Sequence, residues 1–305
     1  MKIYKSLMSA IVTMLVSVSN AGAQIDKKTV IRVDDVTYSS PFTEMDAQMI
    51  RNKIIVAINN TRRVRVVDNS SSIQNLLYAE SERRKRESAM DGNTVADMTT
   101  INADSRLSIE LKSMQITPKV QKDTKSVIDS DGKPKQVVAR EYTYYDAELI
   151  YNVTITDCES GKEQGREVFF VEDGGVSFKD GPEYTSEEDA HNGIIRVTYP
   201  DLLINRLILN TFKAHGKILQ ADEGDAKKAK TVFIDLGSSD GVNESHFFDV
   251  YKETNNTREL IGEIEVIEIL SASRCLAKVK KGGDAIQYVL STGGNPLVIS
   301  KDVKI

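Results

Sequence analysis

Two long stretches in which apolar and polar residues alternate constrain the fold of this chain more than any other feature. In residues 103–116 the apolar side chains Leu107, Ile109 and Leu111 fall on every second position, and residues 142–156 repeat the pattern. Alternation with a period of two is typical of a strand that buries one face. We therefore expect a long antiparallel pair of strands at the centre of the first folded domain.

The residues between these stretches, 117–141, are polar and contain Pro118, Pro134 and an Asp131-Gly132 turn signal. We expect a polar insertion that separates the two strands. If this segment formed a hairpin in a bilayer, charged side chains would face lipid in either register. Each lysine near the midplane would cost about 2–4 kcal/mol, so we expect no membrane pore.

The segment before the central pair predicts a strand, a helix and a second strand. Residues 29–38 are rich in β-branched side chains, which favours a strand. Thr43 and Asp46 have the spacing of a helix N-cap, helical periodicity follows over 49–58, and a short strand is expected at 63–68. This order favours parallel pairing through a right-handed crossover.

A second helix is expected after residues 70–72, and its basic run at 83–86 is flanked by Glu80, Glu82 and Glu87. Glu80–Arg84 and Glu82–Arg86 are spaced for ion pairs along one helix. We interpret the run as a solvated helix end and not as a polyanion site.

The remaining elements divide the chain into two folded parts. A further strand is expected at 166–171, followed by helices at 186–197 and 200–214. Five short strands follow, which favours a small barrel or sandwich: 231–236, 247–252, 260–270, 274–280 and 297–300. The predicted class is α+β, with a mixed α/β sandwich domain at 24–219, a polar linker at 220–230 and a small β-barrel-like domain at 231–305.

The first 23 residues have the three parts of a cleavable export signal. Lys2 and Lys5 precede an apolar core at 7–18, and Ala21-Gly22-Ala23 predicts cleavage before Gln24. The apolar core is shorter than the roughly 20 residues that a spanning helix needs. We expect an exported chain with no transmembrane segment after cleavage.

Charge and cysteine content narrow the function further. Removing the two signal lysines takes the net charge from -5 to -7, which gives no global reason to bind nucleic acid or an anionic membrane. Cys158 lies in a turn-like stretch, and Cys275 alternates with apolar residues as in a core. We do not expect a bond between them, and whether each is free stays open.

One segment matches a catalytic motif. Residues 237–241 read Gly-Ser-Ser-Asp-Gly, which fits the nucleophile elbow of serine hydrolases with Ser239 as nucleophile. The elbow requires a helix after the serine, whereas the sequence predicts another strand, and His246 follows too closely. We interpret the segment as a turn between strands and keep the hydrolase as an alternative.

The other candidate residues carry simpler interpretations. Asp34-Asp35 suggests a cation site, but a solvated strand end explains it as well. The histidines His191, His215 and His246 are isolated, and no phosphate-binding loop is present. Four tyrosines fall on the expected central strands, where we interpret them as packing residues: Tyr142, Tyr144, Tyr145 and Tyr151. We assign no catalytic, metal or cofactor-binding residue, and we expect no enzyme.

Two stretches resemble known families. The first domain, over about 27–215, resembles the curli-assembly CsgG-like family, the N-terminal domain of the translocation protein TolB and penicillin-binding-protein activators. The resembling residues are Val30 to Asp35, the helix through 50–58, the strand at 63–68, and the strand 147–157 with Ser160-Gly161-Lys162.

The second domain resembles the C-terminal domain of the flagellar assembly protein T family. The similar residues are 232–242, 247–251 and 261–266, although Ser245-His246 stands where that family has a Gly-Asp pair. These resemblances imply an envelope scaffold or assembly factor, periplasmic or peripherally associated with the outer membrane. Its partners would be envelope proteins, and a homo-oligomer is left open. The remaining alternatives are an activator of a cell-wall synthase and the secreted hydrolase.

Overall fold

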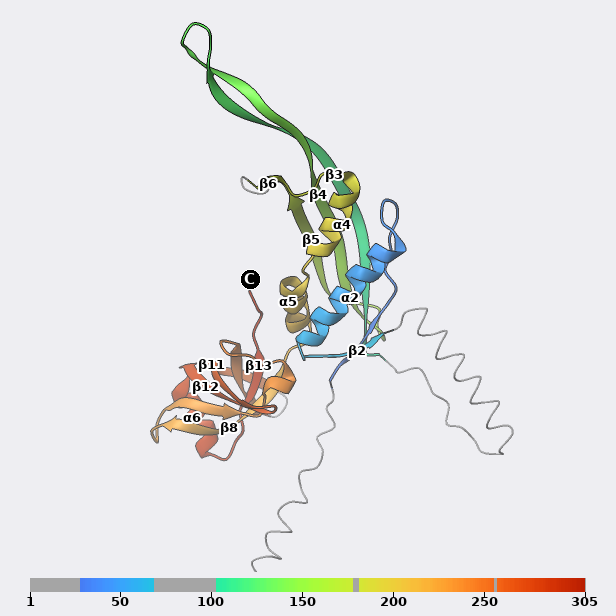
Figure 1. The fold of residues 1–305 in the computed structure, drawn as a ribbon. Coiled ribbons are helices and arrows are strands. Elements are labelled where there is room, and N and C mark those ends of the chain that lie inside the picture. Colours follow the sequence, from blue (N-terminus) through green and yellow to red (C-terminus); the bar gives the residue numbers. More distant parts are fainter. Residues whose placement is uncertain (1–27, 69–102, 178–180, 255–256, 305) are drawn as a thin grey trace, which may run out of the picture.

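The computed structural model describes residues 28–68, 103–177, 181–254 and 257–304, and it has the expected α+β class (Figure 1). The first domain is built on a five-stranded mixed sheet with strand order β2-β1-β3-β4-β5. Its strands are β1 (Val30–Val33), β2 (Arg65–Asp68), β3 (Ser105–Ile128), β4 (Pro134–Asp157) and β5 (Glu163–Gly174). A short hairpin, β6 (Val176–Ser177) with β7 (Gly181–Pro182), follows.

The expected strand–helix–strand unit is present. Helix α2 (Glu44–Asn60) connects β1 to β2, and the two strands pair in parallel, which confirms the crossover. Thr43 caps the helix: its hydroxyl accepts the Asp46 backbone N–H, and the Asp46 carboxylate accepts the Thr43 backbone N–H. This reciprocal pair satisfies donors that the helix itself cannot satisfy.

Two later helices complete the layer over the sheet. Helix α4 (Glu187–Val197) begins after its N-cap Ser186, and α5 (Asp201–Thr211) begins after Pro200, which is its N-cap residue. Both helices and α2 contribute apolar side chains to one core with the strands. Within that core the Tyr151 and Phe169 rings stack with centroids 4.4 Å apart. Helices α2, α4 and α5 therefore cover one face of this sheet (Figure 1).

The two central strands are longer than the sequence predicted. They pair in register from Ser105 opposite Asp157 to Ile128 opposite Pro134, so most of the segment 117–141 belongs to β3 and β4. The polar insertion is therefore the outer part of this hairpin, because a backbone ladder can form whatever the polarity of the side chains. The Asp129 carboxylate closes the tip by accepting the Asp131 and Lys133 N–H groups, and Gly132 adopts a positive φ of 76°.

The second domain is a closed six-stranded barrel (Figure 1). Its strands are β8 (His215–Gly224), β9 (Ala229–Ile234), β10 (Phe247–Thr254), β11 (Thr257–Ser271), β12 (Arg274–Lys281) and β13 (Leu297–Ser300). A 3-10 turn η1 (Ser238–Asp240) follows β9, and helix α6 (Gly283–Ser291) precedes β13.

Residues 220–230, which suggested a linker, instead carry the end of β8 and the start of β9. The polar composition reflects the exposed side of β8 and a tight turn, in which Asp225 accepts the N–H groups of Lys227 and Lys228. The chain enters the barrel between the end of α5 and His215, directly after the helix.

The two domains share several polar contacts. The Asn210 side chain exchanges two hydrogen bonds with the backbone of Val303, at 3.2 and 2.7 Å. Lys213 pairs with Asp302 on the same C-terminal segment. Arg63 of the first domain also donates to the Gly241 carbonyl of the barrel at 3.3 Å. The C-terminal residues thus return to α5 and join the barrel to the first domain.

Several expectations concern residues that the structure does not describe. The export signal at 1–23, the helix after 70–72 and the basic run at 83–86 lie outside the described residues. Within the described ranges, no helix combines the length and apolarity that crossing a membrane requires.

Candidate functional site

The outer part of the β3–β4 hairpin extends beyond the body of the first domain (Figure 1). We refer to residues 117–144 as the arm. Strand β1 pairs with β3 up to Val33 opposite Leu107, and the segment after β1 reaches only as far as the bond from the Leu111 N–H to the Thr37 carbonyl. Strand β5 pairs with β4 only up to Asp146 opposite Gly174. Among the described residues, both edges of the arm therefore lack a neighbouring strand.

The arm has no core of its own. The last side chains that pack against the domain core lie at its base, at Met114, Ile116 and Tyr145. Further out, Val120 is 56% exposed and Ile128 is 78% exposed. A lone two-stranded ribbon is only marginally stable in water, and open strand edges invite pairing with another chain.

The arm differs in charge from the rest of the molecule. It carries six basic and four acidic side chains, which leaves +2 in a chain whose total is -5. Ion pairs at its base join Lys119 to Asp146 and Lys122 to Glu141. Within the part of the chain that the structure describes, no ion pair is found for Lys125, Lys133 and Lys135 nearer the tip. The outer arm therefore offers free positive charge beside exposed β-branched side chains.

The tyrosines of the central strands divide between the core and the arm. Tyr151 is fully buried, which confirms its interpretation as a packing residue. Tyr142, Tyr144 and Tyr145 are half-buried near the base of the arm, and the Arg140 guanidinium lies 5.5 Å from the centroid of the Tyr142 ring.

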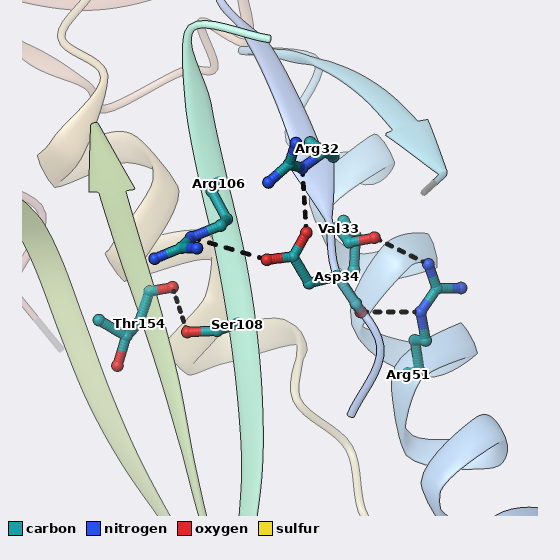
Figure 2. A network of polar contacts seen from close by, with 7 residues as sticks. All are labelled: Arg32, Val33, Asp34, Arg51, Arg106, Ser108 and Thr154. Carbon is teal, nitrogen blue, oxygen red and sulfur yellow. Dashed lines mark hydrogen bonds and ion pairs between the residues drawn. The ribbon is translucent and has the colours of Figure 1, made fainter. Parts of the chain in front are cut away.

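The Asp34-Asp35 pair, weighed as a cation site, is surrounded by arginines. Figure 2 shows the Asp34 carboxylate between Arg32 at 3.0 Å and Arg106 at 3.6 Å. Arg51 donates to the backbone carbonyls of Val33 and Asp34 on the other side of β1. Positive side chains already compensate Asp34, and no group of three or more potential metal ligands occurs among the described residues.

The Gly-Ser-Ser-Asp-Gly segment forms the turn η1 between β9 and β10, which confirms its interpretation as a turn. The Ser239 hydroxyl donates to the Ala272 carbonyl at 2.5 Å. His246 accepts the Asn243 N–H through Nδ1. A nucleophile elbow needs a helix after the serine, whereas a three-residue turn and a strand follow here.

The two cysteines and His191 lie in different parts of the fold: Cys158 follows β4, Cys275 lies in β12 and His191 lies in α4. Cys158 is exposed, Cys275 is buried, and both are free. Burial first, with the charges of Asp240 and Asp235, raises the pKa of Cys275 to about 12, so the thiol stays protonated. His191 lies 2.9 Å from the Asp46 carboxylate and joins α4 to the N-terminus of α2.

Two features, the length of the β3–β4 hairpin and the burial of Arg63, had little signal in the sequence. The pairs Val127-Ile128 and Val137-Val138 were the signal that strands continue through the polar segment, because β-branched residues favour strands. Arg63, which lies in the predicted strand 63–68, is instead buried at the domain junction. No local pattern marks a residue whose burial depends on a second domain.

Comparisons with known proteins add no family. No protein-family model matches the chain, and no curated protein matches it. A solved structure, the hypothetical protein CT253 from Chlamydia trachomatis, is similar over 59% of this chain and 98% of that chain, with 10% sequence identity and a TM-score of 0.27. A similarity this weak supports no argument about fold or function.

Proposed function

We propose that this chain is an exported, non-enzymatic protein of the cell envelope that acts by binding other envelope proteins, as an assembly or secretion accessory. The observation that carries this proposal is the arm: a two-stranded ribbon with two open edges and no core. The resemblance of the sequence to curli-assembly and flagellar assembly families points to the same class of function.

In the isolated chain the arm contributes little to folding stability. A ribbon with side chains as exposed as Val120, Ile128 and Val138 buries little apolar surface, so it adds little to folding stability. A partner strand that adds to one edge would satisfy the free backbone groups and cover these side chains. The lysines near the tip favour a partner segment with acidic residues.

The test replaces residues 120–143 by Asn-Gly, a two-residue turn that joins the paired residues Lys119 and Tyr144. Because the domain core lies outside the deleted part, the shortened chain should fold and be exported at wild-type levels. We expect crosslinking pull-downs from intact cells to recover a specific envelope protein with the full chain and to lose it with the shortened chain.

A matched control alters the body of the first domain. Val56 is 57% exposed on α2, much like Val138 on the arm, and Val56→Ser should leave the recovered protein unchanged. Equal recovery by the full and the shortened chains would contradict the role of the arm.

A further inference from the structure

A cleft lies at the junction of the two domains. None of its lining residues belongs to the arm, so they play no part in the proposed protein contacts. It has a volume of about 470 Å³, which falls within the range of small-molecule sites. Apolar side chains form part of its wall: Leu209, Phe247 and Val303. Polar residues complete it: Arg63, Ser245, His246, Glu263, Ser300, Lys301, Asp302 and Lys304.

Arg63 is the unusual member of this set. Its side chain is buried at the junction, with 8% of the residue exposed. One nitrogen donates to the Gly241 carbonyl at 3.3 Å, whereas Nε and Nη1 are buried and have no hydrogen-bond partner among the described residues. Buried charges in proteins are normally paired, so this guanidinium lacks its counter-ion.

The nearest acidic groups do not supply that counter-ion. The charge of Asp240 acts on Arg63, but its carboxylate accepts the Gly237 N–H at 2.8 Å. No ion pair within 4 Å joins Arg63 to an acid among the described residues. Burial lowers the pKa of Arg63 to about 10, with Asp240 opposing the shift. The side chain nevertheless stays positive at neutral pH.

The two acids that line the cleft are compensated by other residues. Glu263 accepts a hydrogen bond from Lys301 at 2.6 Å and lies 3.5 Å from Lys281. Asp302 pairs with Lys213. No ion pair is found for Lys304 among the described residues. The cleft therefore combines uncompensated positive charge with an apolar wall.

The histidine in the wall adds a neutral donor. Because Nδ1 of His246 accepts the Asn243 N–H, the ring proton resides on Nε2, for which no acceptor is found among the described residues. Burial, followed by the charge of Arg63, lowers the pKa of this imidazole. His246 is therefore a neutral hydrogen-bond donor at pH 7, which suits an anionic acceptor.

From this arrangement we propose that the cleft binds a small organic carboxylate, with its negative group against Arg63 and its apolar body against Leu209, Phe247 and Val303. The carboxylate supplies the counter-ion that the described residues do not provide. A guanidinium is well suited to this anion because its planar donors match the carboxylate geometry. Without a ligand, the buried Arg63 guanidinium has no counter-ion among the described residues, which lowers the stability of the fold.

Isothermal titration of the purified chain with benzoate tests the proposal, and benzyl alcohol serves as the neutral probe of similar shape. We expect benzoate to bind and benzyl alcohol to bind at least about tenfold more weakly. Arg63→Met should weaken benzoate binding about tenfold to a hundredfold, as expected for a hydrogen bond to a charged group. Arg62→Met is the matched control, because Arg62 is adjacent but exposed, and it should bind benzoate as the wild type does.

Thermal unfolding separates binding from a structural role. Replacing a buried unpaired charge by an apolar side chain is expected to leave the midpoint unchanged or raise it, so Arg63→Met should remain folded. If that variant fails to fold, the shift of the His246 ring resonances during a benzoate titration of the wild type locates the ligand without a mutation. Absence of benzoate binding up to about 10 mM, equal binding by the two probes, or unchanged His246 resonances would each overturn the proposal.

Discussion

The inner and outer halves of the β3–β4 hairpin share one backbone ladder but have opposite surroundings. In the inner half, Leu107, Ile109 and Val153 are buried under the helices, and β1 and β5 flank the pair. In the outer half, Val120 and Val138 are more than half exposed, and neither edge has a neighbouring strand within the described part of the chain. Pairing therefore continues where packing ends, which indicates that the inner half stabilises the fold while the outer half is available for contacts.

Amide hydrogen exchange should show the largest difference between the two halves. Inner-strand amides open only with unfolding of the domain, whereas amides on the open edges of the arm open locally. We expect outer amides in 120–128 to exchange at least about a thousandfold faster than inner amides in 149–155, given ordinary domain stability. Similar protection in both halves of the isolated chain would mean that the arm is covered, and the contrast would be wrong.

Matched substitutions in one strand should show the next largest difference. Val153→Ala removes two methyl groups from a fully buried site and should lower the free energy of unfolding by about 2 kcal/mol. Val138→Ala makes the same change on the exposed arm and should change it by about 0.5 kcal/mol or less. Chemical denaturation of the purified chains measures both values. A comparable loss at Val138 would show that the arm packs against something in the isolated chain.

The outcome at each element shows what local sequence can and cannot predict. The capping pair Thr43 and Asp46 was predictable because both partners lie within one helical turn. The inner strands were predictable because alternation reports burial of one face. The continuation of β3 and β4 into the arm was not predicted, since these outer strands bury neither face. Residues 220–230 were interpreted as a linker because the turn between β8 and β9 is polar. Burial of Arg63 depends on residues about 180 positions away, which no local pattern encodes.

Stability at acid pH should depend on the Asp46 carboxylate at the N-terminus of α2 and not on the arm. Burial alone would raise the pKa of Asp46, but hydrogen bonds from the Thr43 backbone, His191 and the Thr43 hydroxyl outweigh it, and the pKa is lowered from 3.8. The stabilisation is therefore present above pH 3.8 and is lost as the pH falls through the lower value of the folded state.

Unfolding measured between pH 6 and pH 2 tests this dependence. Asp46→Asn should flatten the loss of stability below about pH 4, in addition to lowering stability at neutral pH through the lost cap. Asp123→Asn on the arm is the control, since no hydrogen bond or ion pair of Asp123 is found among the described residues, and it should keep the wild-type profile. An unchanged profile for Asp46→Asn would assign the acid sensitivity elsewhere.

The smallest effect on stability is expected from the lysines near the tip of the arm. Replacing Lys125, Lys133 and Lys135 together by glutamine should change the free energy of unfolding by about 0.5 kcal/mol or less. The same variant should recover less of the partner protein in pull-downs, and the deficit should shrink at high salt because salt screens exposed charges. A large loss of stability would show that these lysines serve the fold.

Site-specific photo-crosslinking in intact cells tests the central claim most directly. A photoreactive phenylalanine analogue placed at Val138 on the arm is compared with the same analogue at Val56 on α2, two sites of similar exposure. We expect a discrete crosslinked envelope protein from the analogue at Val138 and none from the analogue at Val56. Crosslinks from Val56 with none from Val138 would contradict the assignment of the arm as the contact surface.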